Sequence, residues 1–219
     1  MKNILKVLVL ALAGVAFGAA AADDVGLVNQ LSGDVTYSSA GHSAKARAFM
    51  KVREGDRFNV PSGAKVRVVY FHGGRQESFS GPASFTAGSA QSAVQSGAQP
   101  QVGTLPTGVS QKIAQAPELI QIARLGRSGG VAVRGAVREP QLTSEQQAEV
   151  RQAHQTYEQL RKTASADDIT PEMYLYSVLQ DYLLYDDMKQ VVAEMQKRQP
   201  ANPDVAVMVD YVKARTEAR

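Results

Sequence analysis

The stretch Lys65-Val-Arg-Val-Val-Tyr-Phe71 decides the fold class of this chain. In an extended strand, alternate side chains point to opposite faces. One face of this stretch carries Val66, Val68 and Tyr70, and the other carries Arg67, Val69 and Phe71. Because apolar residues occur on both faces, we expect a strand that is buried on both sides near its end.

Further short strands are predicted on both sides of this stretch. Alternating apolar residues begin at Val25 and are interrupted by a Gly33-Asp34 turn. After Gly73-Gly74 the chain returns over residues 76–80, and Gly81-Pro82 interrupts it again. Short strands separated by Gly, Pro and Asp at such spacing are typical of a sandwich or barrel. We therefore expect an all-β domain over residues 23–90.

A linker is predicted after this domain, over residues 91–128. Of the 31 residues from Ala87 to Pro117, 25 are Ala, Gly, Ser, Thr, Gln or Pro. Such a composition offers little apolar surface to offset the entropy of ordering the chain. A short apolar helix is expected over 118–125. Residues 129–140 then alternate in the manner of a strand, which could rejoin the β domain.

The last part of the chain, residues 141–219, has a helical pattern. Thr143 is a candidate N-cap with Gln146 three residues on, and this helix is expected to end near Thr163. Thr170 followed by Pro171 predicts a second start. Two further helices follow, separated by prolines. The chain as a whole is therefore expected to be α+β, a β sandwich or barrel followed by a small helical bundle.

The first 22 residues have the composition of a secretory signal peptide. Lys2 and Lys6 flank the start of a short apolar run, and Ala20 and Ala22 form an Ala-x-Ala cleavage site. An uncleaved N-terminal anchor is the alternative, but the apolar run is short for a membrane span. We expect an exported, periplasmic protein that has no stable membrane anchor after cleavage.

No residue pattern in the chain predicts catalysis. There is no cysteine, which excludes thiol chemistry, disulfides and zinc–thiolate sites. The three histidines, His42, His72 and His154, have no second ligand at metal-binding spacing. The pairs Asp167-Asp168 and Asp186-Asp187 precede predicted helices, where carboxylates cap free N–H groups. We therefore expect no catalytic residue, no metal, no cofactor and no enzyme activity.

Charge is distributed unevenly, and one arginine cluster is a candidate contact for an anion or partner. Residues 23–140 hold 13 basic and 8 acidic side chains, whereas residues 141–219 hold 9 and 13. The cluster comprises Arg124, Arg127, Arg134 and Arg138. Guanidinium groups bind carboxylates and phosphates bidentately. A solvated surface is the alternative, and nucleic acid is not expected because residues 112–140 contain no aromatic side chain.

Four tyrosines fall on one predicted helix and its continuation. We expect Tyr174 and Tyr182 to pack inward, whereas Tyr176 and Tyr185 are candidates for an exposed docking face for another protein. Partial burial of all four is the alternative.

A set of short motifs follows the predicted strands, with Gly33, Asp34, Gly55, Asp56, Pro61, Gly63, Gly73 and Gly81 as its members. The order and spacing of these motifs resemble the FecR-like domain, a β-rich periplasmic module. Gly63 and Gly73 stand where hairpins must reverse. The founding type of the family carries a membrane helix and a cytoplasmic segment before the β domain, and this chain departs from it there. The resemblance implies a non-catalytic periplasmic recognition domain.

Residues 174–203 resemble one degenerate tetratricopeptide-type helix pair, and a plain helical bundle is the alternative. Taken together, we expect an adaptor that binds envelope proteins in signalling or assembly. The alternative is a module that binds a cell-wall polymer, either peptidoglycan or another anionic glycan.

Overall fold

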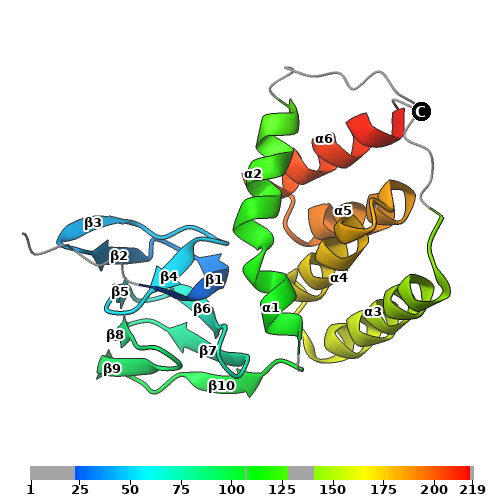
Figure 1. Ribbon diagram of the computed structural model, residues 1–219. Coiled ribbons are helices and arrows are strands. Elements are labelled where there is room, and N and C mark those ends of the chain that lie inside the picture. Colours follow the sequence, from blue (N-terminus) through cyan, green and yellow to red (C-terminus); the bar gives the residue numbers. More distant parts are fainter. Residues whose placement is uncertain (1–22, 107, 128–140, 218–219) are drawn as a thin grey trace, which may run out of the picture.

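A computed structural model describes residues 23–106, 108–127 and 141–217. The chain forms two antiparallel five-stranded sheets followed by a bundle of helices, so the α+β prediction is confirmed. Figure 1 shows the strands on one side of the molecule and the helices on the other, with α1 and α2 between them. The predicted signal peptide, with its cleavage-site residues Ala20 and Ala22, and the strand expected over 129–140 lie outside the described residues.

Each sheet mixes strands from distant parts of the chain. Sheet A has the order β10-β7-β6-β1-β4: β10 Gln101–Thr104, β7 Arg75–Ser80, β6 Lys65–Tyr70, β1 Asp24–Ser32 and β4 Lys51–Arg53. Sheet B has the order β3-β2-β5-β8-β9: β3 His42–Lys45, β2 Thr36–Ser39, β5 Arg57–Val60, β8 Ala83–Ala87 and β9 Ser92–Gly97.

Strand β6 lies between two cores, as its alternation predicts. Val66, Val68 and Tyr70 are buried between the two sheets, whereas Val69 joins a core shared with the helices. Aromatic rings connect the sheets: the centroids of Phe79 in sheet A and Phe85 in sheet B are 3.9 Å apart. The two sheets therefore form a sandwich, and sheet A is covered on both faces.

The helices pack around α4. Their bounds are α1 Val109–Ala114, α2 Ala116–Arg127, α3 Ser144–Thr163, α4 Thr170–Asp181, α5 Tyr185–Arg198 and α6 Pro203–Glu217. α4 lies against α1, α3 and α5, and α6 lies against α2 and α5. Among these described helices, none combines the length and the apolar character needed to cross a membrane.

Within the linker predicted over 91–128, the structure has β9, β10 and α1, and α2 covers the short helix expected over 118–125. β9 and β10 are edge strands that hydrogen-bond to β8 and β7, so they need few apolar residues of their own. α1 buries Val109 and Ile113 in the core between sheet A and the other helices. Leu105, Val109, Ile113, Leu119 and Ile120 of this segment are thus buried against other elements, which offsets the ordering entropy.

The two predicted helix starts differ in their outcome. Thr143 forms the expected capping box: its side chain accepts a hydrogen bond from the Gln146 N–H, and the Gln146 side chain accepts one from Thr143. Thr170 does not cap α4. It is the first helical residue, and the Asp168 carboxylate accepts a hydrogen bond from its N–H at 2.8 Å.

Candidate functional site

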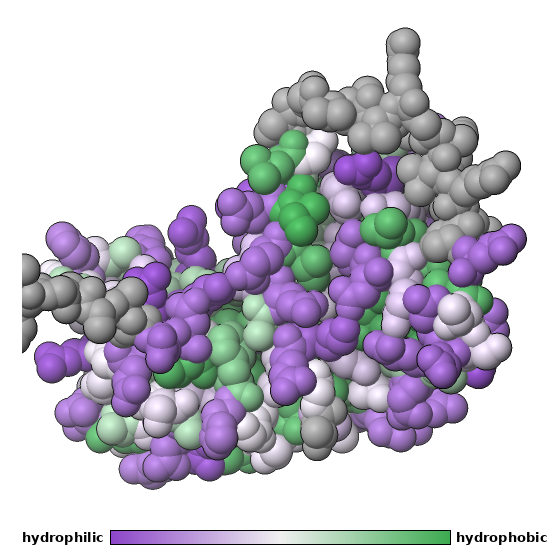
Figure 2. Space-filling view, in the orientation of Figure 1, coloured by the Kyte–Doolittle hydropathy of each residue, from purple (hydrophilic) through white to green (hydrophobic). Residues whose placement is uncertain are grey.

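A hollow lies between the sandwich and α2. This cleft has a volume of about 570 Å³ and is lined by the β2–β3 hairpin, residues 47–53, α2 and the start of α6. Figure 2 shows it as a notch in the outline of the molecule, bordered by hydrophilic side chains. The side chains used below are Arg47, Phe49, Met50, Lys51, Arg53, Ile120 and Arg124.

Two turns with unusual backbone shape one wall of the cleft. Ala40 and Gly41 join β2 to β3 with φ of 47° and 83°, the two-residue hairpin turn that matches strand twist. Phe49 also has a positive φ, 58°, and its N–H donates to the Val28 carbonyl at 2.6 Å. A non-glycine residue in this region costs on the order of 1 kcal/mol. Burial of the Phe49 ring, only 4% exposed, offsets that cost.

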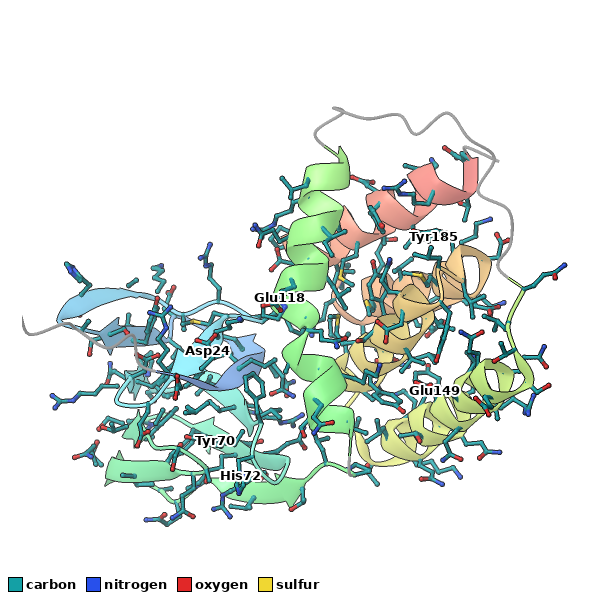
Figure 3. The ribbon with its side chains drawn as sticks, viewed as in Figure 1. Asp24, Tyr70, His72, Glu118, Glu149 and Tyr185 are labelled. Carbon is teal, nitrogen blue, oxygen red and sulfur yellow. The ribbon has the colours of Figure 1, made fainter. Side chains whose placement is uncertain are left out.

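Lys51 joins the sandwich to α2 at the floor of the cleft. Its ammonium lies 2.7 Å from the Glu118 carboxylate on α2 and 3.0 Å from Asp24 on β1. Figure 3 labels these two carboxylates, one on each side of the junction. The hydrogen bond to Glu118, and then that to Asp24, raise the pKa of Lys51 above its ordinary value. This bridge fixes the spacing of the two walls.

Three arginines line the cleft. Arg53 contacts Asp24 through Nε alone, at 3.4 Å, and its side chain is 55% exposed. Arg124 pairs with Asp204 at the start of α6. Arg47 is exposed and forms no ion pair with the part of the chain that the structure describes. Guanidinium groups carry five N–H donors, so Arg47 and Arg53 retain donors for an anionic ligand.

Apolar side chains lie beside these cations. Among the apolar residues that line the cleft, Met50 is partly exposed, whereas Phe49 and Ile120 are only 4% and 5% exposed. Further along α2, Ile122 and Leu125 are 46% and 65% exposed. Figure 2 shows hydrophobic side chains exposed over α2. Arginine and methionine are enriched in protein interfaces, and methionine adapts to irregular partners. The arrangement suits a ligand that has both apolar and acidic groups.

A polar joint holds the sandwich against the helices. Asn29 Nδ2 donates to Thr170 Oγ1 at 2.7 Å, Gln30 Nε2 donates to Asp167 Oδ2 at 2.6 Å, and Arg67 pairs with Asp168. From the sequence, Asp167 and Asp168 are predicted only to cap the N-terminus of a helix. Their partners are about a hundred or more residues away along the chain, so no local pattern signals the joint.

A buried charge cluster supports the joint from the helical side. The Glu172 carboxylate is fully buried and accepts from Arg161 and Arg198, each at 3.0 Å. Arg161 also donates to the carbonyls of Ser165 and Asp168, both at 2.6 Å. The turn between α3 and α4 is thereby held in one conformation.

Of the predicted arginine cluster, Arg124 lines the cleft. Arg127 is the last residue of α2. Arg134 and Arg138 lie outside the described residues. The other cationic side chains in the cleft lining are Arg47, Lys51 and Arg53. No motif in the sequence predicts these three residues as a binding site.

The predicted docking face is wrong. Tyr176 is 1% exposed and Tyr185 4%, so neither side chain offers a surface. α4 is enclosed by its neighbours and buries every residue from Thr170 to Leu179, hence Tyr176 cannot face solvent. The Tyr185 hydroxyl lies 3.5 Å from the Tyr211 hydroxyl on α6, and burial raises its pKa to about 12. These tyrosines belong to the helical core (Figure 3).

The FecR-like motif residues lie at turns of the sandwich. Gly33, Gly55, Gly63 and Gly73 all have positive φ, between 74° and 89°. The backbone at Gly81 packs against the backbone at Pro61, and a Cβ added to Gly81 would lie 1.8 Å from the Pro61 carbonyl oxygen.

The two acidic motif residues have different surroundings. Asp34 is exposed and pairs with Lys45 at 2.7 Å, and this contact lowers its pKa. Asp56 is 3% exposed and accepts a hydrogen bond from the Arg53 N–H at 2.9 Å. All of these roles are structural.

The histidines hold separate positions. His72 is exposed in the β6–β7 turn, as expected, His42 borders the cleft, and His154 lies on α3. Over residues 23–106, 108–127 and 141–217, no group of three His, Cys, Asp or Glu side chains could hold a metal ion.

Comparison with known proteins adds no relative. No family model matches the chain, and neither the curated proteins nor the solved structures yield a match.

Proposed function

We propose that the protein is a periplasmic, non-catalytic adaptor with a FecR-like β domain, and that it binds an envelope protein in the cleft between the sandwich and α2. The partner contributes an acidic segment with apolar side chains. The single observation behind this proposal is the meeting of Arg47, Arg53 and Arg124 with Phe49, Met50 and Ile120 in one preformed hollow.

The composition of the cleft favours a protein ligand over a glycan at this place. The exposed residues Ile122 and Leu125 add apolar surface further along α2, outside the lining of the cleft itself. Apolar surface of this kind is stabilised by contact with apolar side chains, which a polyhydroxylated ligand lacks. Acidic groups of the partner would be held by the Arg47 guanidinium and by the free donors of Arg53.

The fixed geometry of the cleft supports binding without rearrangement. Lys51 ties β4 to both β1 and α2, and the Asn29–Thr170 and Arg67–Asp168 contacts hold the sandwich on the helices. A preformed site loses less conformational entropy on association.

Site-specific photocrosslinking in intact cells tests the proposal. A photoreactive residue at Met50 or Ile122 should yield a discrete adduct with one envelope protein, identified by mass spectrometry. Arg47→Glu should reduce that adduct by about tenfold or more, because the acidic partner is repelled. Lys189→Glu on α5, far from the cleft, is the matched control. Absence of a protein adduct at both cleft positions would overturn the proposal.

A further inference from the structure

The outer face of sheet B is the second surface of interest. The inner face of this sheet packs on sheet A, and the helices cover only the far side of sheet A (Figure 1). Along β5 the side chains alternate, with Phe58 and Val60 buried and Arg57 and Asn59 exposed. The exposed positions therefore face away from the cleft and from the joint.

Strand pairing aligns these exposed positions in two rows. The first row runs Lys45–Thr36–Asn59–Ser84–Ser96 across the five strands. The second row runs Ser43–Ser38–Arg57–Thr86–Ala93. Seven of the ten side chains are Ser, Thr or Asn, two are basic, and none of the ten is a carboxylate.

The hydroxyl groups of this face are ordered by contacts with one another. The Ser84 and Ser96 hydroxyl oxygens are 2.8 Å apart, and Gln95 Nε2 donates to Thr86 Oγ1 at 3.4 Å. Each hydroxyl both donates and accepts, so such a row can hydrogen-bond the hydroxyl groups of a sugar chain. Because the side chains are short, little rotamer entropy is lost when they are fixed.

Arg57 stands in the middle of the second row. It is exposed, and it forms no ion pair with any residue from the described ranges. The other cation of the face, Lys45, is held by Asp34 at 2.7 Å. A hollow of about 420 Å³ lies over Thr36, Ser38, Arg57, Ser84 and Thr86. Its volume is in the range of small-ligand sites, about 300–1,000 Å³.

We infer that the outer face of sheet B binds peptidoglycan, a glycan whose peptide stems carry carboxylates. The sugar hydroxyl groups contact the Ser and Thr rows, and the Arg57 guanidinium binds a carboxylate of the peptide stem bidentately. Because this face is opposite the helices, glycan and protein can be bound at the same time. The inference goes beyond the protein-binding cleft and does not depend on it.

Titration of the purified full chain with soluble muropeptides, followed by NMR or calorimetry, tests this inference. Binding should weaken about tenfold or more in Arg57→Gln, which removes the charge-assisted contact, and several-fold in Thr86→Val. Arg47→Gln in the cleft is the matched control and should bind as the native chain does. An unchanged thermal midpoint in each variant shows that the fold is retained.

A neutral oligomer of N-acetylglucosamine distinguishes binding through the sugar hydroxyl groups from binding of a carboxylate by Arg57. It offers similar hydroxyl groups but no carboxylate, so it should bind at least about tenfold more weakly than the muropeptide. Equal binding of both ligands would overturn the role of Arg57. If neither ligand binds, or if Arg57→Gln binds as well as the native chain, the face is a solvated surface only. The crosslinking at Met50 and Ile122 is unaffected by either result.

Discussion

Asn29 on β1 donates a hydrogen bond from Nδ2 to Thr170 Oγ1 on α4, 141 residues away, and both side chains are buried. Thr170→Val removes the acceptor and leaves a buried amide without it. We expect the free energy of unfolding to fall by about 1–3 kcal/mol, the cost of a buried unsatisfied polar group. Urea denaturation followed by circular dichroism measures this loss.

The double variant Asn29→Leu/Thr170→Val distinguishes the hydrogen bond from packing. With both polar groups replaced, no buried donor remains unpaired, so part of the lost stability should return. The Asn29 Oδ1 atom has no hydrogen-bond partner among the described protein groups, so replacing Asn29 with Leu also removes a buried unsatisfied acceptor and should raise the stability further. Additive losses in the double variant would show that Thr170→Val acts through packing alone.

Glu172 is the most consequential charge in the helical region. Glu172→Gln keeps the shape of the side chain but leaves the largely buried guanidiniums of Arg161 and Arg198 without their carboxylate. Breaking a buried pair on one side costs about 3–5 kcal/mol, and we expect a loss of this order in chemical denaturation. Glu194→Gln is the control: its carboxylate is 36% exposed, 3.7 Å from Arg198, and should contribute less than about 1 kcal/mol.

The sandwich was predictable because its signals are local. The alternation of Val66, Val68 and Val69 indicates a strand with two buried faces, and the structure places it between two cores. The capping box at Thr143 likewise depends on neighbours three residues apart. Period and turn chemistry are properties of short segments, so the sequence alone reveals them.

The cleft and the joint were not predictable in the same way. Arg47, Lys51 and Arg53 meet Arg124 only because α2 packs beside β4, which no pattern within either segment indicates. Tyr176 is a residue whose burial was not predicted. Its spacing on α4 made it a candidate for an exposed face, but α4 is enclosed on several sides. Burial of a helix on more than one face depends on tertiary packing rather than on periodicity.

Gly81 and Gly63 should respond very differently to alanine. A Cβ at Gly81 would lie 1.8 Å from the Pro61 oxygen, so Gly81→Ala must displace backbone and should cost about 3 kcal/mol or more. Gly63 has a φ of 78° but open space around it, so Gly63→Ala should cost only about 1 kcal/mol of conformational strain. Thermal or urea unfolding of the two variants checks the order, and equal losses would contradict the close contact.

Tyr70 makes the stability of the sandwich sensitive to alkaline pH. Burial, the largest cause, raises its pKa from 10.0 to about 12, while the hydrogen bond with Ser92 opposes the shift. Between pH 10 and 12 the unfolded chain therefore ionises this tyrosine and the folded chain does not. The unfolded state then binds fewer protons, so stability is unaffected below pH 10 and falls as the pH rises through this window.

Tyr70→Phe isolates this contribution. At pH 7 the variant loses the contact with the Ser92 hydroxyl, 2.7 Å away, and should be less stable by about 1 kcal/mol. From pH 9 to 11.5 it should lose less stability than the native chain, by on the order of 1 kcal/mol, because one late-titrating group is gone. Burial also raises the pKa of Tyr176, which remains in both chains and shifts their curves alike. Parallel stability curves over this range would show that Tyr70 ionises equally in the folded and unfolded states.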